Sequence, residues 1–303
     1  MSRNRFRGSA RFASVTAVIL LAGSAAGGIC LAGLSSDQTP RTAASVSSVP
    51  AAGSTPDLAT TREEPTVDLD AALAAAVEPL LTDVGDAEVS VAVLDTGSGA
   101  RAVYGDGAYD TASIVKVDIL AALLLMAQDE KRALTAGERG HARAMIEQSD
   151  NASATALLRA IGGAEALDAA NERLGLTGTT AAHAWGLTQT TAADQLVLLK
   201  AVFGTESELS AASRTYLRRL MGQVVADQQW GVSAAGNDWA LKNGWLPRTA
   251  TGLWDINSIG QVRADGRTYL VAVLSGGQRT METGIALVES VAKAAVGVLD
   301  AAR

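Results

Sequence analysis

Three short segments of the sequence carry side chains that could transfer an acyl group. Ser113 and Lys116 stand three residues apart at the start of an apolar stretch, so on a helix the hydroxyl and the amine lie on one face. A hydroxyl attacks a carbonyl carbon when a base removes its proton, and a lysine becomes such a base when burial lowers its pKa. The other two segments are Ser149-Asp150-Asn151 and Lys242-Asn243-Gly244-Trp245. The chain has 20 arginines but only five lysines, and two of those five lie in these segments.

Each segment also has a structural explanation that involves no chemistry. Ser113 could cap a helix while Lys116 points to solvent. Ser149-Asp150-Asn151 suits a helix N-terminus, because all three residue types are common caps. Gly244 could allow a ligand to approach the backbone closely, or it could mark a bulge in a strand. Taken singly, the three segments leave both interpretations open.

The three segments are expected to be held by a sheet built from both ends of one folded region. Residues 88–94 alternate with period two and a Gly-rich turn follows them, which predicts a β-hairpin. The predicted strands are 88–94, 100–104, 239–245, 254–263 and 268–274, and the predicted helices are 69–84, 113–129, 135–148, 152–161, 164–174, 191–203 and 279–299. This order predicts an α/β (α+β) fold: a five-stranded antiparallel sheet flanked by the terminal helices, with an inserted all-helical lobe.

The first 66 residues are expected to export and tether the folded region rather than to belong to it. Residues 1–34 hold four arginines, no acidic residue and an uncharged run over 13–34, which is typical of a signal peptide or signal anchor. Residues 35–66 hold four of the six prolines among many Ser, Thr and Ala residues, which predicts a disordered linker. We therefore expect one extracytoplasmic domain over 67–303, secreted or anchored, with membrane contact only through residues 13–34.

Composition argues against several other kinds of function. The net charge of −7 repels the phosphate backbone of nucleic acids, so no nucleic-acid partner is expected. Cys30 is the single cysteine, and neither His141 nor His183 has companions at metal-ligand spacing, so we expect no metal and no other cofactor. Trp245 is expected to line a site, while Trp185 and the other tryptophans are assigned to the core in preference to a sugar-binding platform. The protein is expected to be a monomer.

The order of the three segments resembles a known signature. A Ser-x-x-Lys, a Ser-Asp-Asn and a Lys-x-Gly in this order resemble the motifs of penicillin-recognising serine enzymes, and specifically of class A β-lactamases. Residues 93–99 and 109–113, and the last two strands with the closing helix, are also similar to that family. The resemblance covers residues 67–303. It implies a β-lactamase/D,D-peptidase-like fold and an active-site serine hydrolase that acts on small-molecule β-lactams or on peptidoglycan stem peptides.

The resemblance also implies a role for each matching residue. Ser113 would be the acylated nucleophile, Lys116 its proton acceptor, and Ser149 the group that passes a proton to the leaving nitrogen. Asn151 would contact the amide side chain of the substrate while holding Lys116. Lys242 would attract the substrate carboxylate and polarise Ser149.

The strand segment would complete the binding site, with two departures from the family. The backbone N–H groups of Ser113 and Trp245 would form an oxyanion hole, and Gly244 and Asn243 would border the substrate. Asn243 stands where the family has threonine or serine, so a hydroxyl contact to the carboxylate would be lost or replaced by an amide contact. Residues 174–203 contain no glutamate, although the family uses one there to activate the deacylating water, so slow deacylation is expected. A D-Ala-D-Ala peptidase, a catalytically retired cell-wall-binding protein, and an esterase or amidase remain alternatives.

Overall fold

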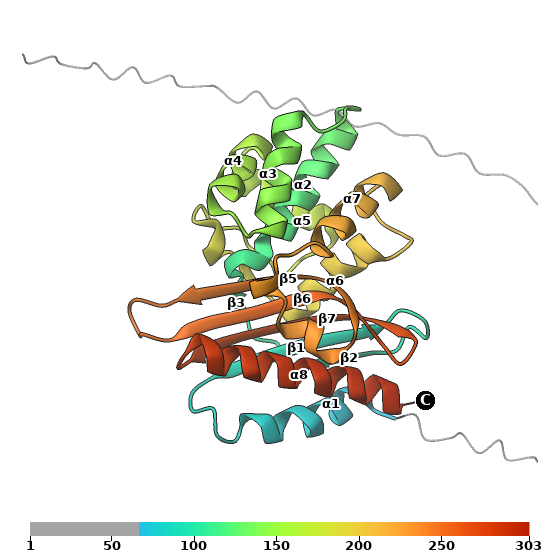
Figure 1. Cartoon of the computed structure of the whole chain (residues 1–303), viewed down its shortest axis with the longest axis vertical. Coiled ribbons are helices and arrows are strands. Elements are labelled where there is room, and N and C mark those ends of the chain that lie inside the picture. Colours follow the sequence, from blue (N-terminus) through green and yellow to red (C-terminus); the bar gives the residue numbers. More distant parts are fainter. Residues whose placement is uncertain (1–66, 303) are drawn as a thin grey trace, which may run out of the picture. The chain divides into compact units, whose positions relative to one another are not determined.

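A five-stranded antiparallel sheet forms the centre of the computed structural model, which describes residues 67–302. The strands lie in the order β2-β1-β7-β6-β5 (Figure 1). Their bounds are β1 (Glu88–Asp95), β2 (Arg101–Tyr104), β5 (Asp238–Pro247), β6 (Trp254–Ala264) and β7 (Arg267–Gln278). Two short strands, β3 (Tyr109–Asp110) and β4 (Gln189–Thr190), pair with each other in a second sheet. The predicted five-stranded antiparallel sheet is confirmed.

Helices cover both faces of this sheet. The first and last helices lie against one face, and the α-helices between β3 and β5 lie on the other (Figure 1). The α-helices are α1 (Leu69–Val77), α2 (Val115–Asp129), α3 (Ala136–Glu147), α4 (Asn151–Ile161), α5 (Ala164–Leu174), α6 (Ala192–Phe203), α7 (Ala211–Met221) and α8 (Met281–Ala301). The 3-10 helices are η1 (Glu78–Leu81), η2 (Ala112–Ile114), η3 (Trp185–Leu187), η4 (Ala226–Gln228) and η5 (Gly231–Ala235). The inserted helical lobe and the flanking terminal helices are therefore confirmed.

The main differences from the sequence prediction concern three helical segments. The helix predicted over 69–84 ends at Val77, because Pro79 in the next turn has no N–H to continue the hydrogen-bond ladder. Ser113 lies in the 3-10 turn η2 that precedes α2, rather than in the helix itself. Helix α7 was not predicted, and Ser210 caps it by accepting a hydrogen bond from the Ser213 N–H group.

The central strands bury both of their faces. On β7, Tyr269 and Val271 pack in the core formed with α1 and α8. Leu270 and Ala272 point the other way, into the core formed by the inserted helices. Because successive side chains of a strand alternate between faces, a strand covered on both sides reads as a continuous apolar run.

Helix α2 lies inside the helical half, and its burial determines the environment of the site. Twelve of its 15 residues are buried, so the helix has no broad face toward solvent. Two charged residues of the helix, Lys116 and Asp118, are consequently fully buried. Among residues 67–302 no helix has both the length and the apolar character needed to cross a membrane. The export segment and linker predicted over residues 1–66 lie outside the described residues.

Candidate active site

The turn that carries Ser113 is fixed by its neighbours. Ala112, the residue before it, has a φ of 47°, a conformation that costs free energy for a residue with a Cβ and persists only when surroundings impose it. Asn257 of β6 supplies part of that constraint, because its Nδ2 donates hydrogen bonds to the carbonyl oxygens of Asp110 (2.9 Å) and Thr111 (3.1 Å). The turn that carries Ser113 is thus attached to the middle of the sheet.

Strand β5 runs directly beside this turn, which explains the glycine at position 244. A Cβ on Gly244 would lie 2.7 Å from the carbonyl oxygen of Thr111 and 2.8 Å from the backbone nitrogen of Ser113. Both distances are too short for any other residue. Pairing with β6 continues through Gly244 without a shift of register, so this glycine marks a close backbone approach and not a bulge.

Lys116 joins two of the three segments singled out in the sequence. Its Nζ lies 2.8 Å from the Ser113 Oγ and 2.8 Å from the Asn151 Oδ1. The same nitrogen contacts the hydroxyl of Ser149 at 3.0 Å and its carbonyl oxygen at 2.7 Å. Burial lowers the pKa of Lys116 from 10.5 to about 7, and the carboxylate of Asp150 only partly opposes this effect. A substantial fraction of this amine is therefore neutral near pH 7 and can accept a proton.

Ser149 lies between two amines. It has a φ of 57° and follows the end of α3, while Asp150 caps α4 by accepting a hydrogen bond of 2.7 Å from the Ser153 N–H group. The explanation of this segment as a helix cap is therefore correct for Asp150. Ser149, the residue before it, still contacts the lysines of the candidate site. The Nζ of Lys242 donates to the Ser149 Oγ at 3.0 Å, as Lys116 does. Burial, and then the charge of Lys116, lower the pKa of Lys242.

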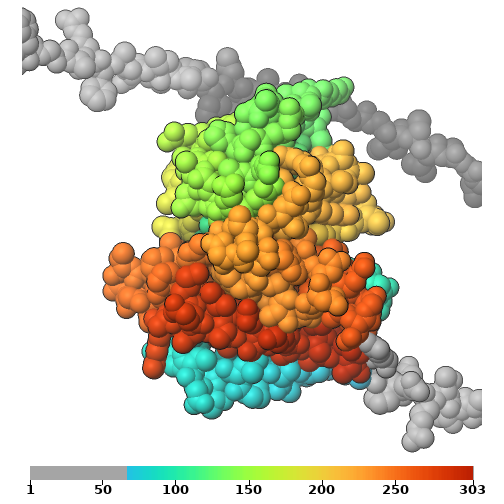
Figure 2. Space-filling model, in the orientation of Figure 1, coloured from blue at the N-terminus to red at the C-terminus, as the bar shows by residue number. Residues whose placement is uncertain are grey.

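Asn243 does not face the pocket, which corrects the expected amide contact to substrate. Its side chain is fully buried. Its Nδ2 donates to the carbonyl oxygens of Gln228 (2.8 Å) and Trp230 (3.0 Å). Because side chains alternate along β5, Asn243 points away from the face that carries Lys242. Its role is to attach β5 to the segment between α7 and η5, which lies between the helical half and the sheet on the face shown in Figure 2.

An apolar pocket of about 430 Å³ opens beside Ser113. Its polar wall consists of Ser113 and Asn151, and much of the rest is formed by Trp185, Leu187, Trp245 and Leu246. Neither Asp nor Glu lines it. The expectation that Trp245 borders the site agrees with this position.

Trp185 was assigned to the core; it packs against the core of the helical half and also lines the pocket beside Ser113, which the sequence analysis did not predict. Its ring centroid lies 4.9 Å from the Nζ of Lys116, and its Nε1 donates to the hydroxyl of Thr155 at 3.2 Å. The indole therefore covers the amine on the pocket side. An ammonium over an indole face is favoured electrostatically. No sequence pattern marked Trp185, because it lies in a single 3-10 turn, η3, between α5 and β4.

An ion-pair network that the sequence analysis missed holds the far end of β5. Arg248 pairs with Asp110 and, at 2.6 Å, with Asp255. Gln189 of β4 donates a hydrogen bond to Asp110 as well. Burial raises the pKa of Asp255, and Arg248 opposes that rise. Because Asp110 stands three residues before Ser113, this network links the β5–β6 hairpin to the turn that carries Ser113.

Among residues 67–302, no group of three or more His, Cys, Asp or Glu side chains is placed to hold a metal ion. The four side chains with expected catalytic roles, Ser113, Lys116, Ser149 and Lys242, do meet in one place through the contacts above. Their roles stay predictions. The arrangement itself provides a hydroxyl beside a partly neutral amine, and a second hydroxyl beside two amines.

Comparison with protein families identifies a relationship over the second half of the sequence. A family model described as the Beta-lactamase enzyme family matches residues 139–299. This range includes Ser149 and Lys242 and begins after Ser113. A search of curated proteins finds no match.

Solved structures share the fold. A class A beta-lactamase from Bacteroides cellulosilyticus DSM 14838 superposes with a TM-score of 0.67 and 18% identity, over 77% of this chain and 99% of that chain. The TLA-1 extended spectrum beta-lactamase gives 0.69 and 19%, over 76% and 99%. A mutant of PBP-A, solved as an acyl-enzyme complex with penicillin G, gives 0.65 and 22%, over 76% and 96%. The expected β-lactamase/D,D-peptidase-like fold is confirmed.

Proposed function

The chain belongs to the Beta-lactamase enzyme family, and we propose from this premise that it is an active-site serine hydrolase acylated at Ser113. The observation that carries the proposal is the contact of 2.8 Å between the Ser113 Oγ and the Nζ of Lys116, whose pKa is lowered to about 7 by burial. A base with a pKa near the working pH is the most effective proton acceptor.

Acylation follows from the contacts around the two hydroxyls. Neutral Lys116 takes the proton of Ser113 as its Oγ bonds to the substrate carbonyl carbon. The proton then moves from Lys116 to Ser149, which gives its own proton to the leaving nitrogen as the carbon–nitrogen bond breaks. Lys242 donates to the Ser149 Oγ and so orients that hydroxyl. The backbone N–H groups of Ser113 and Trp245 would stabilise the charge on the carbonyl oxygen.

Deacylation is proposed to be slow. Hydrolysis of the acyl-enzyme needs a water that a base activates, and no carboxylate lines the pocket beside Ser113. Trp185 covers Lys116 on the pocket side, so the indole stands between that amine and an incoming water. The related PBP-A mutant that was solved as an acyl-enzyme with penicillin G supports a persistent intermediate on this fold.

The substrate classes proposed are β-lactams and the D-Ala-D-Ala ends of stem peptides. A peptidase is the second candidate, and the absence of Asp and Glu from the pocket lining is the observation that favours it over an efficient lactamase. Residues 1–66 begin with four arginines, continue with an uncharged run over 13–34 and end in a proline-rich stretch over 35–66. This order supports a location outside the cytoplasm.

Intact-mass spectrometry of the full chain after exposure to penicillin G tests this function. The expected result is a mass increase equal to one penicillin on the wild type, which decays over minutes or longer and is absent from Ser113→Ala. Ser290→Ala, a change on α8 at the far face of the sheet, is the matched control and should label normally. Absence of label on Ser113 would refute the acylation, and turnover within seconds would refute slow deacylation. Release of D-alanine from an acyl-D-Ala-D-Ala peptide identifies the peptidase.

A further inference from the structure

Arginines of α3 and α7 surround a second pocket on the helical half. This pocket has a volume of about 290 Å³, and Arg139, Arg143 and Arg219 line it together with Glu147 and Tyr216. Three guanidinium groups and one carboxylate leave the lining with an excess of positive charge. The whole chain carries a net charge of −7, so this pocket is basic although the protein as a whole is acidic.

Two of the three arginines have no carboxylate to pair with among residues 67–302. Arg143 pairs with Glu147 at 2.9 Å. Arg139 donates instead to the carbonyl oxygen of Leu134, and the guanidinium of Arg219 lies 5.4 Å from the ring centroid of Tyr216. The charges of Arg139 and Arg219 both lower the pKa of Tyr216 in opposition to its burial, which places both guanidinium groups near one phenol.

An unpartnered acceptor lies in the same pocket. Glu147 is 6% exposed, and its Oε1 is buried without a hydrogen-bond partner, while its other oxygen is held by Arg143. A buried oxygen without a donor is costly unless a bound group supplies one. Within the described part of the chain, the pocket lining therefore holds two guanidinium groups without a carboxylate partner and one carboxylate oxygen without a hydrogen-bond donor.

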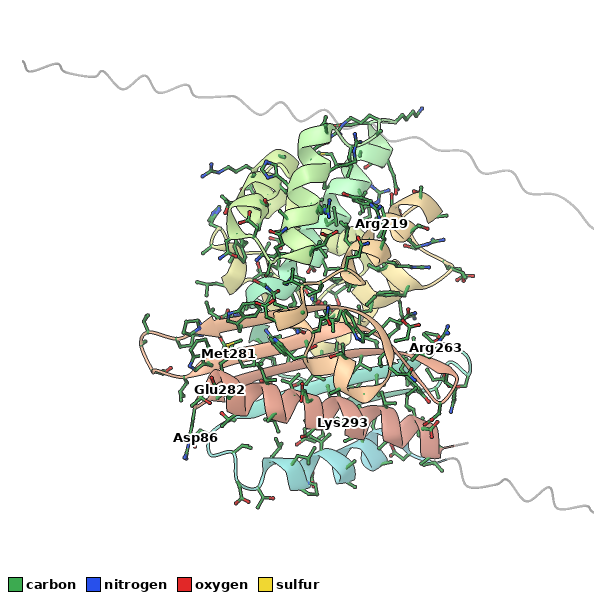
Figure 3. All side chains as sticks on the ribbon, viewed as in Figure 1. Asp86, Arg219, Arg263, Met281, Glu282 and Lys293 are labelled. Carbon is green, nitrogen blue, oxygen red and sulfur yellow. The ribbon has the colours of Figure 1, made fainter. Side chains whose placement is uncertain are left out.

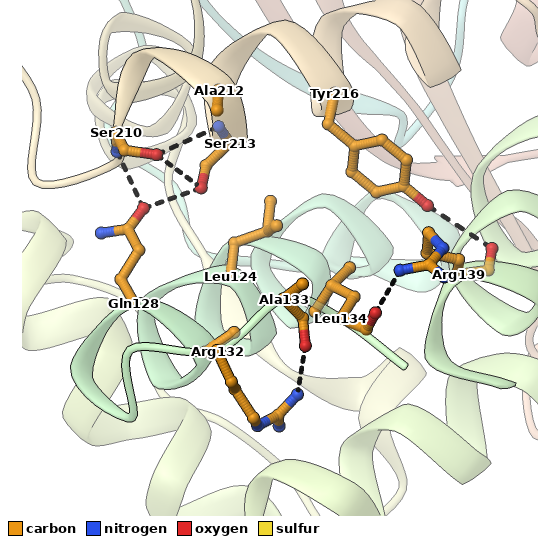
Figure 4. Close-up of a pocket in the computed structure, with 11 residues that line it drawn as sticks. Leu124, Gln128, Arg132, Ala133, Leu134, Arg139, Ser210, Ala212, Ser213 and Tyr216 are labelled. Carbon is orange, nitrogen blue, oxygen red and sulfur yellow. Dashed lines mark hydrogen bonds between the residues drawn. The ribbon is translucent and has the colours of Figure 1, made fainter. Parts of the chain in front are cut away.

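A neighbouring pocket provides room for an uncharged substituent. It shares Arg139 and Tyr216 with the basic pocket and has a volume of about 280 Å³. Figure 4 shows Leu124 and Leu134 in its wall, with Arg139 beside Tyr216 at one end. A ligand with an anionic group in one pocket could place a short apolar portion in the other.

We propose that this basic pocket binds a phosphate ester. Phosphate oxygens suit the guanidinium groups of Arg139 and Arg219, because arginine binds phosphate through two parallel N–H bonds. A P–OH group, or a hydroxyl of a glycerol phosphate, supplies the donor that the Oε1 of Glu147 lacks. Sulfate has the oxygens but carries no proton near pH 7, so the pocket discriminates between the two anions. This site is separate from Ser113 and does not depend on the proposed hydrolase activity.

Thermal unfolding of the full chain with added anions tests the proposal. Inorganic phosphate and glycerol phosphate should raise the Tm progressively with concentration, and sulfate at equal ionic strength should bind at least about tenfold more weakly, since it leaves one hydrogen bond unmade. The double variant Arg139→Gln/Arg219→Gln should weaken phosphate binding by about a hundredfold or more, because two charge-assisted interactions are lost. Equal stabilisation by sulfate, or phosphate binding retained by the double variant, would overturn the proposal.

Arg263→Gln provides the matched control. Arg263 is exposed on β6, and Figure 3 shows it at the sheet while Arg219 lies on the helical half. This variant removes one positive charge, where the double variant removes two, and should bind phosphate as the wild type does; weakening by about tenfold, half of the double variant's loss in binding free energy, would show general charge attraction and overturn the site. Cosedimentation with phosphatidylglycerol vesicles then identifies the source. If the double variant loses the cosedimentation seen with the wild type, the ligand is a lipid phosphate. If cosedimentation is the same for both proteins, the ligand is a soluble phosphate ester.

Discussion

Replacing Asp118 with asparagine should remove a large part of the pH dependence of the domain's stability. Asp118 lies on α2, two residues beyond Lys116, and is fully buried. Burial raises its pKa from 3.8 to about 7. Gln195 lies near enough to oppose this rise, but neither carboxylate oxygen reaches a donor at hydrogen-bond geometry. The protonated acid is therefore the form that the folded state accommodates.

The sign of the effect follows from proton binding. Between pH 3.8 and about 7 the folded state retains a proton on Asp118 that the unfolded chain has released, so the free energy of unfolding falls as pH rises. The two pKa values lie about three pH units apart, and each unit corresponds to about 1.4 kcal/mol. The total loss is therefore about 4 kcal/mol, of which roughly 3 kcal/mol fall between pH 5 and pH 8.

Urea unfolding followed by tryptophan fluorescence at pH 5 and pH 8 measures this difference. The wild type should lose about 3 kcal/mol more than Asp118→Asn over this interval, whatever the asparagine costs at either pH. The pKa of Lys116 is lowered to about 7, so its titration makes the free energy of unfolding increase with pH only above about pH 7. This contribution is the same in both proteins and cancels in the comparison. Asp83→Asn, a change at an exposed carboxylate, should behave as the wild type. Parallel pH profiles for the wild type and Asp118→Asn would refute the reasoning.

Three further predictions concern the proposed site. Acylation by a fluorescent penicillin should rise about tenfold per pH unit below pH 7 and level off above it, because only neutral Lys116 accepts the proton of Ser113; a rate that stays constant from pH 5 to pH 8 would exclude this base. Trp185→Ala should shorten the acyl-enzyme lifetime measured by intact mass, since the indole no longer shields the amine; an unchanged lifetime would contradict the shielding. Arg248→Met should slow acylation and lower the free energy of unfolding by about 1–3 kcal/mol, because buried Asp110 loses its cation. Arg248→Lys should restore part of both, and normal acylation by Arg248→Met would show that the network does not position the turn.

The strands and most helices were predictable because their patterns are local. Residues 88–94 show their period within seven positions, and the run over 269–274 is apolar because both faces of β7 are buried. The spacing of Ser113 and Lys116 was equally informative, since a three-residue interval survives the change from helix to 3-10 turn. A pattern whose residues all lie within one turn or one strand can be interpreted from the sequence alone.

Some of the features that were missed depend on distant contacts, and others had a local signal. Helix α7 carries three arginines among 11 residues but buries Leu217, Leu220 and Met221 along one face, an amphipathic pattern that the prediction overlooked. Trp185 lies over Lys116 only because the 3-10 turn η3 packs against η2, the turn that precedes α2. Arg248 meets Asp110 across most of the inserted lobe. For Asn243 a signal existed, because strand alternation puts its side chain opposite to that of Lys242.

The strand order has a consequence for how this protein is made. Strand β1 is synthesised early, but one of its two partners is β7, which pairs Gly276 with Glu88. Until β7 leaves the ribosome, β1 keeps an open edge, and the β5–β6 hairpin has no strand to dock on. Folding must therefore be completed after nearly all of the chain has been translated, which favours slow folding and a need for protection from aggregation. A nascent chain arrested before β7 would carry Lys242 on a hairpin that the sheet does not yet hold in register.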